Sequence, residues 1–269
     1  MTTHSPSLDL KDWDRVFDAL ERTTVLDEIR RKVYPDDYAE GLKALSMVML
    51  SELRWCAEAL QLDPGDLFVD LGCGLGGPGL WLAAATSTSV MGVDISHVAL
   101  RHARKRSLAS SDVRGARYLV ADASRFPFRD GSLRGALAIG VLQCLSHKSA
   151  ALAELARTLQ PGARLAASTR ELRSSGSGDL PSRFIGDHEP LLRAAGFELV
   201  QREEHHGWEK CHHFYYTRIL ERRDEIATRA GADFQRFIVR DAENVLAILG
   251  ATRRVLLVAE RSNGAAYVR

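Results

Sequence analysis

Five glycines follow a short apolar segment near residue 70, and an aspartate stands at the junction. The segment reads Leu67-Phe-Val-Asp70-Leu-Gly72-Cys-Gly74-Leu-Gly76-Gly77-Pro-Gly79. Glycine lets a backbone approach a ligand closely and adopt dihedral angles that are barred to other residues. Gly72, Gly74 and Gly77 also satisfy the G-x-G-x-x-G spacing of dinucleotide-binding loops, which is a weak fingerprint on its own. The run therefore predicts a nucleotide-binding turn between a strand and a helix.

The carboxylate of Asp70 favours a cationic ligand over a pyrophosphate. A dinucleotide would bring phosphate against this fixed negative charge, which costs several times thermal energy at an effective dielectric constant of about 20. S-adenosylmethionine has no phosphate, and it carries an ammonium on its methionine end and a positive charge on its sulfur. The residues therefore favour this sulfonium nucleoside, with a nicotinamide oxidoreductase as the weaker alternative.

Two further aspartates stand at the ends of later apolar segments. Asp94 ends Val90-Met-Gly-Val-Asp94, where a carboxylate can accept hydrogen bonds from both hydroxyls of a ribose. Asp122 follows the next segment, where it could receive an adenine amino group, and Ile95 could form an apolar wall for the ring. Ordinary turn chemistry is the alternative, since Asp and Gly favour loops anyway.

The elements that would position these residues alternate between short apolar runs and helical patterns, as in a parallel sheet with crossover helices. The pattern predicts strands at 67–71, 90–94, 117–121, 135–140, 163–169, 197–203 and 255–259. It predicts helices near 78–85, 96–109, 148–159 and 187–195, and a flexible loop at 174–178. The fold class is thus α/β, with a Rossmann-like, mostly parallel sheet of seven strands and helices on both faces.

Helical patterns before and after these strands predict two additions to the core. Residues 1–62 are expected to form an N-terminal helical lid, in which apolar residues recur at helical spacing. The core then spans 63–204. Residues 205–252 are expected to form an inserted helical cap, because this stretch is far longer than a hairpin needs, and 253–269 hold the last strand of the core and a tail.

In combination, these segments resemble the class I S-adenosylmethionine-dependent methyltransferases, and most of all the small-molecule methyltransferases of bacterial secondary metabolism. The matching segments are VDLGCGLGGPG, GVDIS, ADASRFPFRDGS, IGVLQCL and ELARTLQPGARLAAS. In the last of them, Ala163 stands where the family usually has a second glycine. The resemblance covers roughly residues 34–260 and implies S-adenosyl-L-methionine as cofactor and S-adenosyl-L-homocysteine as product.

The same resemblance implies which residues bind the cofactor. They would surround the methionine end, the ribose, the adenine edge and the sulfur in turn, and they are Asp70, Gly72, Cys73, Gly74, Asp94, Ile95, Asp122, Ala123, Gly140 and Gln143.

The acceptor is expected to be a small molecule whose oxygen, nitrogen or carbon atom receives the methyl group. Some such acceptors need a base, and histidine, with an unperturbed pKa of about 6.5, is the usual one. The candidates by location are His147, Glu171, His205 and His206, for which a helix cap or a surface position is the plainer interpretation. The candidates for acceptor contact are Tyr34, Tyr38, Trp208 and Tyr215, for which core packing is the alternative.

The amino-acid composition limits the classes of binding partner that we expect. Lys and Arg total 36 against 35 Asp and Glu, and a net charge of +1 lacks the basic excess of a nucleic-acid binder. No apolar run approaches the roughly 18 residues that cross a bilayer, and the first residues lack a secretory signal, so a cytoplasmic protein without membrane contact is expected. The adjacent residues Cys211-His212-His213 do not have metal-ligand spacing, so we expect no metal.

Several alternatives stay open at this level. The chain could hold S-adenosylmethionine as a structural element while it shapes a substrate for cyclisation, or a methylation could trigger a ring closure. The sequence leaves the acceptor, the methylated atom and the oligomeric state undetermined, and a homodimer remains open.

Overall fold

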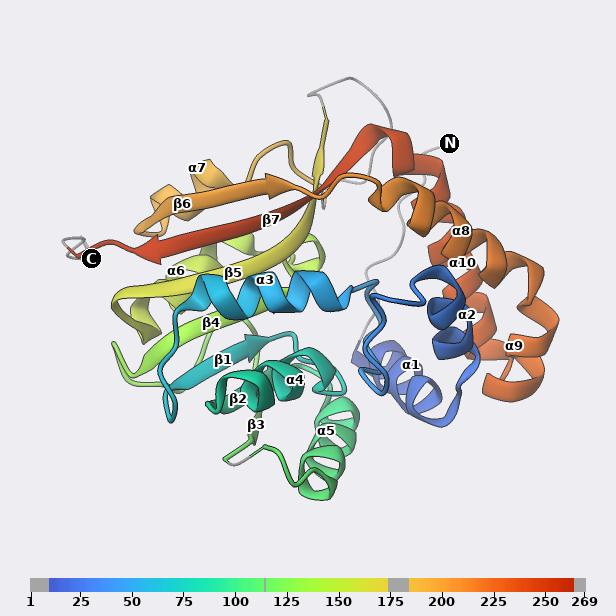
Figure 1. The fold of residues 1–269 in the computed structure, drawn as a ribbon, viewed down its shortest axis with the longest axis horizontal. Helices are drawn as coiled ribbons and strands as arrows, with labels where there is room; N and C mark the ends of the chain where they lie inside the picture. Colours follow the sequence, from blue (N-terminus) through green and yellow to red (C-terminus); the bar gives the residue numbers. More distant parts are fainter. Residues whose placement is uncertain (1–9, 114, 174–183, 264–269) are drawn as a thin grey trace.

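The apolar runs pair into one sheet, and helices cover it (Figure 1). The computed structural model describes residues 10–113, 115–173 and 184–263. Within these ranges the sheet has seven strands in the order β3-β2-β1-β4-β5-β7-β6. The strands are β1 (Leu67–Leu71), β2 (Ser89–Asp94), β3 (Arg117–Val120), β4 (Leu133–Ile139), β5 (Leu159–Leu172), β6 (Phe197–Glu204) and β7 (Thr252–Arg261).

Strands β1 to β5 run parallel, and β7 lies antiparallel between β5 and β6. Figure 1 shows β7 pointing against its neighbours. The predicted Rossmann-like, mostly parallel sheet of seven strands is therefore confirmed. Because the parallel strands share one direction, their carboxyl ends meet at one edge, and this is where ligands bind in such sheets.

Helices cover both faces because side chains alternate along each strand. In β1, Phe68 packs into the cluster that includes α3 and α4, whereas Val69 packs into the cluster that includes α6 and α7. The helices of the described chain are α1 (Leu10–Arg22), α2 (Val25–Val33), α3 (Leu50–Leu60), α4 (Gly77–Thr86), α5 (His97–Ala109), α6 (Lys148–Thr158), α7 (Glu189–Ala194), α8 (Trp208–Glu221), α9 (Arg223–Ala230) and α10 (Ala232–Ile248).

Five of these helices form a layer of their own beside the sheet, which we call the helical layer: α1, α2, α8, α9 and α10. One apolar cluster joins them, with Phe17 and Leu20 from α1 and Tyr215 and Ile219 from α8 among its buried members. The start of the chain and the segment before the last strand therefore share a core, although roughly 200 residues separate them. By contrast, α3, which lies within the range 1–62, packs on the sheet against β5.

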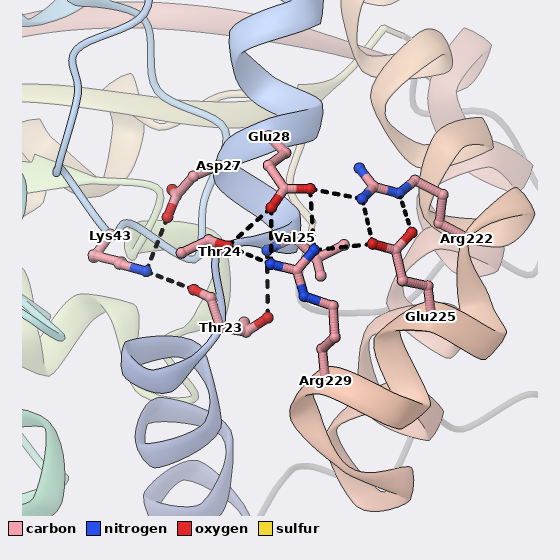
Figure 2. Close-up of polar contacts among 9 residues, drawn as sticks. All are labelled: Thr23, Thr24, Val25, Asp27, Glu28, Lys43, Arg222, Glu225 and Arg229. Carbon is pink, nitrogen blue, oxygen red and sulfur yellow. Dashed lines mark hydrogen bonds and ion pairs between the residues drawn. The ribbon is translucent and has the colours of Figure 1, made fainter.

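Ion pairs also connect the two parts of the helical layer (Figure 2). Glu28 of α2 accepts hydrogen bonds from Arg222 Nη2 at 2.7 Å and from Arg229 Nη2 at 2.8 Å. Glu225 of α9 accepts from the same two arginines at 2.7 and 2.9 Å. The hydrogen bond from Arg229, followed by that from Arg222, lowers the pKa of Glu28 to about 2.

Two strands are longer than the sequence predicts. The segment predicted as 163–169 is strand from Leu159 to Leu172, and that predicted as 255–259 is strand from Thr252 to Arg261. β7 is longer because it pairs with β5 on one side and with β6 on the other, and the backbone hydrogen bonds of these pairs extend to its polar ends. Gly162 has a positive φ of 77° inside β5, where the register with β4 shifts. Ala163, next to it, has no positive φ, so its position does not require a glycine.

The predicted loop at 174–178 lies outside the described residues. Among the residues that are described, no helix combines the length and the apolar character that crossing a bilayer requires.

Candidate functional site

A cavity of about 1920 Å³ lies between the carboxyl edge of the sheet and the helical layer. Loops after β1, β2, β3 and β4 line it, together with the helices α1 and α10. All ten residues that the sequence assigns to cofactor binding line this cavity: Asp70, Gly72, Cys73, Gly74, Asp94, Ile95, Asp122, Ala123, Gly140 and Gln143. The fold thus brings together residues that are spread over more than 70 positions of the chain.

The glycine turn after β1 is bound to the tip of β2. The backbone N–H of Gly72 donates to the carbonyl of Val93 at 2.8 Å, and that of Gly74 donates to Asp94 Oδ2 at 2.9 Å. Gly74 has a φ of 51°, and a Cβ atom there would lie 2.9 Å from the ring of Phe17 in α1. The position therefore requires glycine for two reasons: the backbone angle and the closeness of α1.

Asp94 receives backbone hydrogen bonds on both carboxylate oxygens. Oδ1 accepts from the N–H of Ser96 at 2.9 Å, and Oδ2 accepts from Gly74. Burial raises the pKa of Asp94, and these backbone hydrogen bonds oppose the rise. The side chain is held at the strand tip with further lone pairs that a ribose could use.

Asp70 is buried and incompletely paired. Its side chain is 2 % exposed, and Oδ2 has no hydrogen-bond partner among the described residues. Burial raises the pKa of its carboxyl group to about 8, a hydrogen bond from Gly79 lowers it, and the charge of Asp94 raises it further. A buried acceptor without a donor is costly, so this oxygen suits a ligand that brings a positive charge or an N–H group.

Asp122 lies at the exposed side of the cavity. Its Oδ1 accepts hydrogen bonds from the hydroxyl of Ser124 at 2.6 Å and from its backbone N–H at 2.7 Å. These bonds, and to a smaller degree the charge of His147, lower its pKa. His147 is therefore close to Asp122, on the side of the predicted adenine edge.

Helix α1 is attached directly to this end of the cavity. The hydroxyl of Ser96 donates to Asp14 Oδ1 at 2.6 Å, and His102 Nε2 lies 3.1 Å from Asp18 Oδ1. Because α1 also places Phe17 against the glycine turn, it covers the predicted cofactor position.

Comparisons with known proteins agree with this geometry. A family model described as "Methyltransferase domain" matches residues 68–162, the segment from β1 into β5 that carries the glycine turn and all three aspartates. Residues 68–162 are therefore a methyltransferase domain, and the protein is an S-adenosylmethionine-dependent methyltransferase. The cofactor is S-adenosylmethionine, and the family match outweighs the nicotinamide alternative.

Two curated relatives and one solved structure illustrate the similarity. The chain is 27 % identical to the 27-O-demethylrifamycin SV methyltransferase of Amycolatopsis mediterranei over 76 % of this chain and 78 % of that protein. It is 30 % identical to the methyltransferase GfsG of Streptomyces halstedii, but over only 55 % of this chain and 52 % of GfsG. The crystal structure of the cyclase SpnF superposes with a TM-score of 0.72 at 22 % identity, over 89 % of this chain and 93 % of that one, which shows a common fold.

The side chains of the methyltransferase fit this cofactor. When bound, S-adenosylmethionine supplies an activated methyl group, so the protein's part is to bind, to orient and to exclude water. Asp70, with its unpartnered oxygen, suits the ammonium of the methionine end, and Asp94 suits the ribose. The exposed Asp122 suits the adenine edge.

One of the predicted bases lines the cavity, and three do not. His147 lines it, directly before α6. His206 is exposed and His205 is half-buried, with Nδ1 3.6 Å from Glu52 Oε1, and neither reaches the cavity. Burial lowers the pKa of His205.

Glu171 lies in a separate buried ion network. Its side chain is fully buried, Oε1 accepts from the backbone N–H of His188 at 2.9 Å, and Oε2 lies 3.0 Å from Arg253 Nη2 and close to Arg202. Burial alone would raise its pKa, but the hydrogen bonds from His188 and the charge of Arg202 lower it instead. The structure therefore places Glu171 in a structural network and not in the cavity.

The predicted acceptor-contacting side chains also lie outside the cavity. Trp208 and Tyr215 are each 1 % exposed in the core of the helical layer, and Tyr34 is buried there as well. Tyr38 donates to Asp27 Oδ1 at 3.0 Å. Core packing, the alternative given above for these residues, describes where they lie.

Other side chains, which the sequence analysis did not assign to the site, also line the cavity. Trp13 stacks on Phe17 with ring centroids 5.8 Å apart, and its edge meets Phe237 of α10 at 6.2 Å. Arg170, Tyr216 and Arg254 line the same cavity from β5, α8 and β7. The available signal was a charged residue at the carboxyl end of an apolar strand, in Ala166-Ala-Ser-Thr-Arg170.

Proposed function

We propose that the methyltransferase transfers the methyl group of S-adenosylmethionine to an oxygen, nitrogen or carbon atom of a small molecule in secondary metabolism. The observation that carries this proposal is one cavity lined by the cofactor residues and, beside them, by aromatic rings of α1 and α10; the part of it away from the glycine turn is taken as the acceptor end. A relative that is named for 27-O-demethylrifamycin SV supports a natural product as acceptor. The match of the family model supports the reaction type.

Within this proposal, α1 and α2 act as a lid, residues 205–252 act as a cap, and the enzyme works in the cytoplasm without nucleic acid. His147 is the candidate base, because it alone of the four predicted bases lines the cavity. Phe17, Trp13 and Phe237 keep water from the transferred methyl group. Such a dry, enclosed site favours alignment of the two reactants.

The proposal is tested by calorimetric titration with S-adenosylhomocysteine, followed by incubation with S-adenosylmethionine labelled in its methyl group. We expect tight binding of the nucleoside and transfer of label to members of a panel of small phenols, amines and carboxylic acids, detected by mass spectrometry. Uptake of label into RNA or protein instead, or no binding of the nucleoside, would contradict the proposal.

Cyclisation is the second candidate, because the solved structure of similar fold reported above is that of a cyclase. The mass of the product distinguishes the two. A product heavier by one methyl group supports transfer, and an isomer of unchanged mass supports cyclisation with the cofactor as a structural element.

A further inference from the structure

Two buried arginines lie side by side on one face of the sheet, at the part of the cavity that β5 and β7 line. Arg170 of β5 and Arg254 of β7 are directly opposite in the antiparallel ladder. Their side chains are 7 % and 3 % exposed, and both line the cavity. Like charges in opposite positions of a sheet repel, so this pair requires compensation.

Arg254 has its compensation within the protein. Its Nη2 donates to Glu52 Oε2 at 2.7 Å and to the carbonyl of Met47 at 2.6 Å, and its Nε donates to the other oxygen of Glu52. Glu52 is 1 % exposed and lies on α3. Arg254 and Glu52 thus form a bidentate ion pair, in which the two charges neutralise each other.

Arg170 has no such partner. Among the described residues no carboxylate forms an ion pair with it, and its guanidinium lies 5.5 Å from the centre of the Trp208 ring. Burial and the charge of Asp241 raise the pKa of Tyr216, which lines the same cavity, and the charge of Arg170 opposes this rise. The ring face and the phenol accommodate the guanidinium without neutralising it.

The neighbouring groups leave the site positive. His212 is fully buried, and burial, followed by the charges of Arg170 and Arg254, lowers its pKa well below the usual value, so it stays neutral. Among the described residues, Glu52 is the one carboxylate that forms an ion pair with either guanidinium group, and it pairs with Arg254. Asp241 faces the same cavity from α10, and its charge raises the pKa of Tyr216, but it is not within ion-pair distance of Arg170.

A buried positive charge without a counter-charge is costly, and a ligand that brings the missing negative charge removes this cost. We propose that Arg170, assisted by Tyr216, binds a carboxylate of the acceptor molecule. The guanidinium presents paired N–H donors that match the two oxygens of a carboxylate. This inference rests on the proposed function, since it takes this end of the cavity as the acceptor site.

The position of Arg170 separates it from the cofactor residues. It stands on β5, beyond β4, whereas Asp70 lies within β1, Asp94 ends β2 and Asp122 follows β3. Thr169, its neighbour in the chain, donates to Gln143 Oε1 at 2.9 Å, and Gln143 belongs to the predicted surroundings of the sulfur. Although neighbouring side chains of a strand point to opposite faces, Arg170 and Gln143 both line the cavity, so a carboxylate on Arg170 would hold the acceptor in the same cavity as the methyl-transfer position.

The test compares phenylacetate with phenylacetamide, which differ in charge but hardly in shape, on the full chain saturated with S-adenosylhomocysteine. Calorimetry, with ligand-detected NMR for weak binding, should show a preference of at least about tenfold for the carboxylate in the wild type. Arg170→Gln should bind both compounds equally. Arg164→Gln is the matched control, because Arg164 lies on the same strand, pairs with Glu260 at 3.1 Å and does not line the cavity.

A second readout distinguishes binding from a structural role. Since Arg170→Gln removes an uncompensated charge, its melting temperature should equal or exceed that of the wild type, whereas Glu52→Gln should melt earlier. Equal binding of the two compounds by the wild type, including no binding of either, or a preference retained in Arg170→Gln, would overturn the proposal. So would weaker binding of S-adenosylhomocysteine to Arg170→Gln, because the anion would then be the cofactor's own. Failure of the wild type to bind that nucleoside would instead contradict the proposed function.

Discussion

The two ends of the cavity are built in different ways. At the cofactor end, Asp70, Asp94 and Asp122 each stand at or just beyond the end of a strand, and short segments of sequence carry them. At the acceptor end, α1 and α10 meet, as in the contact of Trp13 with Phe237. A ligand site at strand ends can be predicted from short segments of sequence, whereas a site between packed helices depends on how the chain folds.

The two ends also differ in charge. Asp94 and the ionised form of Asp70 bring negative charge to the cofactor end, whereas Arg170 and Arg254 bring positive charge to the β5 end, where Glu52 is paired with Arg254. A positively charged sulfonium and a negatively charged acceptor would each meet the opposite charge. The cavity can therefore orient two reactants by electrostatics before any close contact forms.

The largest effect is expected at the cofactor end. Asp94→Asn should weaken binding of S-adenosylhomocysteine roughly hundredfold, since hydrogen bonds to a charged group contribute about 1.5–3 kcal/mol each and every 1.4 kcal/mol is tenfold. Titration calorimetry measures this. Asp112→Asn, an exposed aspartate outside the cavity, is the control and should bind normally. Unchanged affinity of Asp94→Asn would remove the ribose role from this residue.

The next effect concerns the contact between the two ends. Phe17→Ala removes the ring that lies against Gly74, so dissociation of S-adenosylhomocysteine should become roughly thirtyfold faster, in line with the loss of about 2 kcal/mol of apolar burial. Stopped-flow fluorescence follows the release. Leu10→Ala on the same helix, where Leu10 is 48 % exposed, should release the nucleoside at the wild-type rate. If both variants behave alike, α1 does not cover the cofactor.

The sequence predicts the sheet, the order of its elements and a set of ten residues that share one cavity, because strand ends of a parallel sheet meet at one edge. It does not predict which aromatic side chains reach that cavity. Trp208 and Tyr215 are aromatic residues in a helical pattern, as are Trp13 and Phe17, but α8 buries its rings in the core whereas those of α1 also line the cavity. Likewise, Glu171 resembles a catalytic residue until its three partners from distant segments are known.

A pH titration tests the charge of the cofactor end. With a pKa of about 8, Asp70 is mostly protonated near neutral pH in the absence of ligand, and a cationic ligand requires its ionised form. Affinity for S-adenosylhomocysteine should therefore rise roughly twenty-five-fold between about pH 6.5 and 8.5, with release of a proton. Calorimetry in buffers of different ionisation enthalpy counts that proton.

The stability of the ligand-free protein should change in the opposite direction. The folded state binds the proton of Asp70 more tightly than the unfolded state, whose pKa is about 3.9. The free energy of unfolding should therefore fall as pH rises from about 4 to 8. Asp70→Asn should remove both pH dependences. If the variant keeps them, another group carries the titration.

The smallest effect is expected within the helical layer, far from both ligands. Glu28→Gln should lower the free energy of unfolding by less than about 1 kcal/mol, because the ion pairs with Arg222 and Arg229 are partly exposed (Figure 2). The folded pKa of Glu28, about 2, lies below the unfolded value near 4.3. The difference in stability between Glu28→Gln and the wild type should therefore be present above about pH 4.3 and vanish as pH falls toward 2.

Glu221→Gln, which breaks a pair with Arg218 inside α8, is the matched control, and urea unfolding measures the stability of both variants. A larger loss for Glu28 than for Glu221, reduced in 1 M salt, supports a lid and a cap that are held together as one body. Equal losses would mean that apolar packing alone joins them.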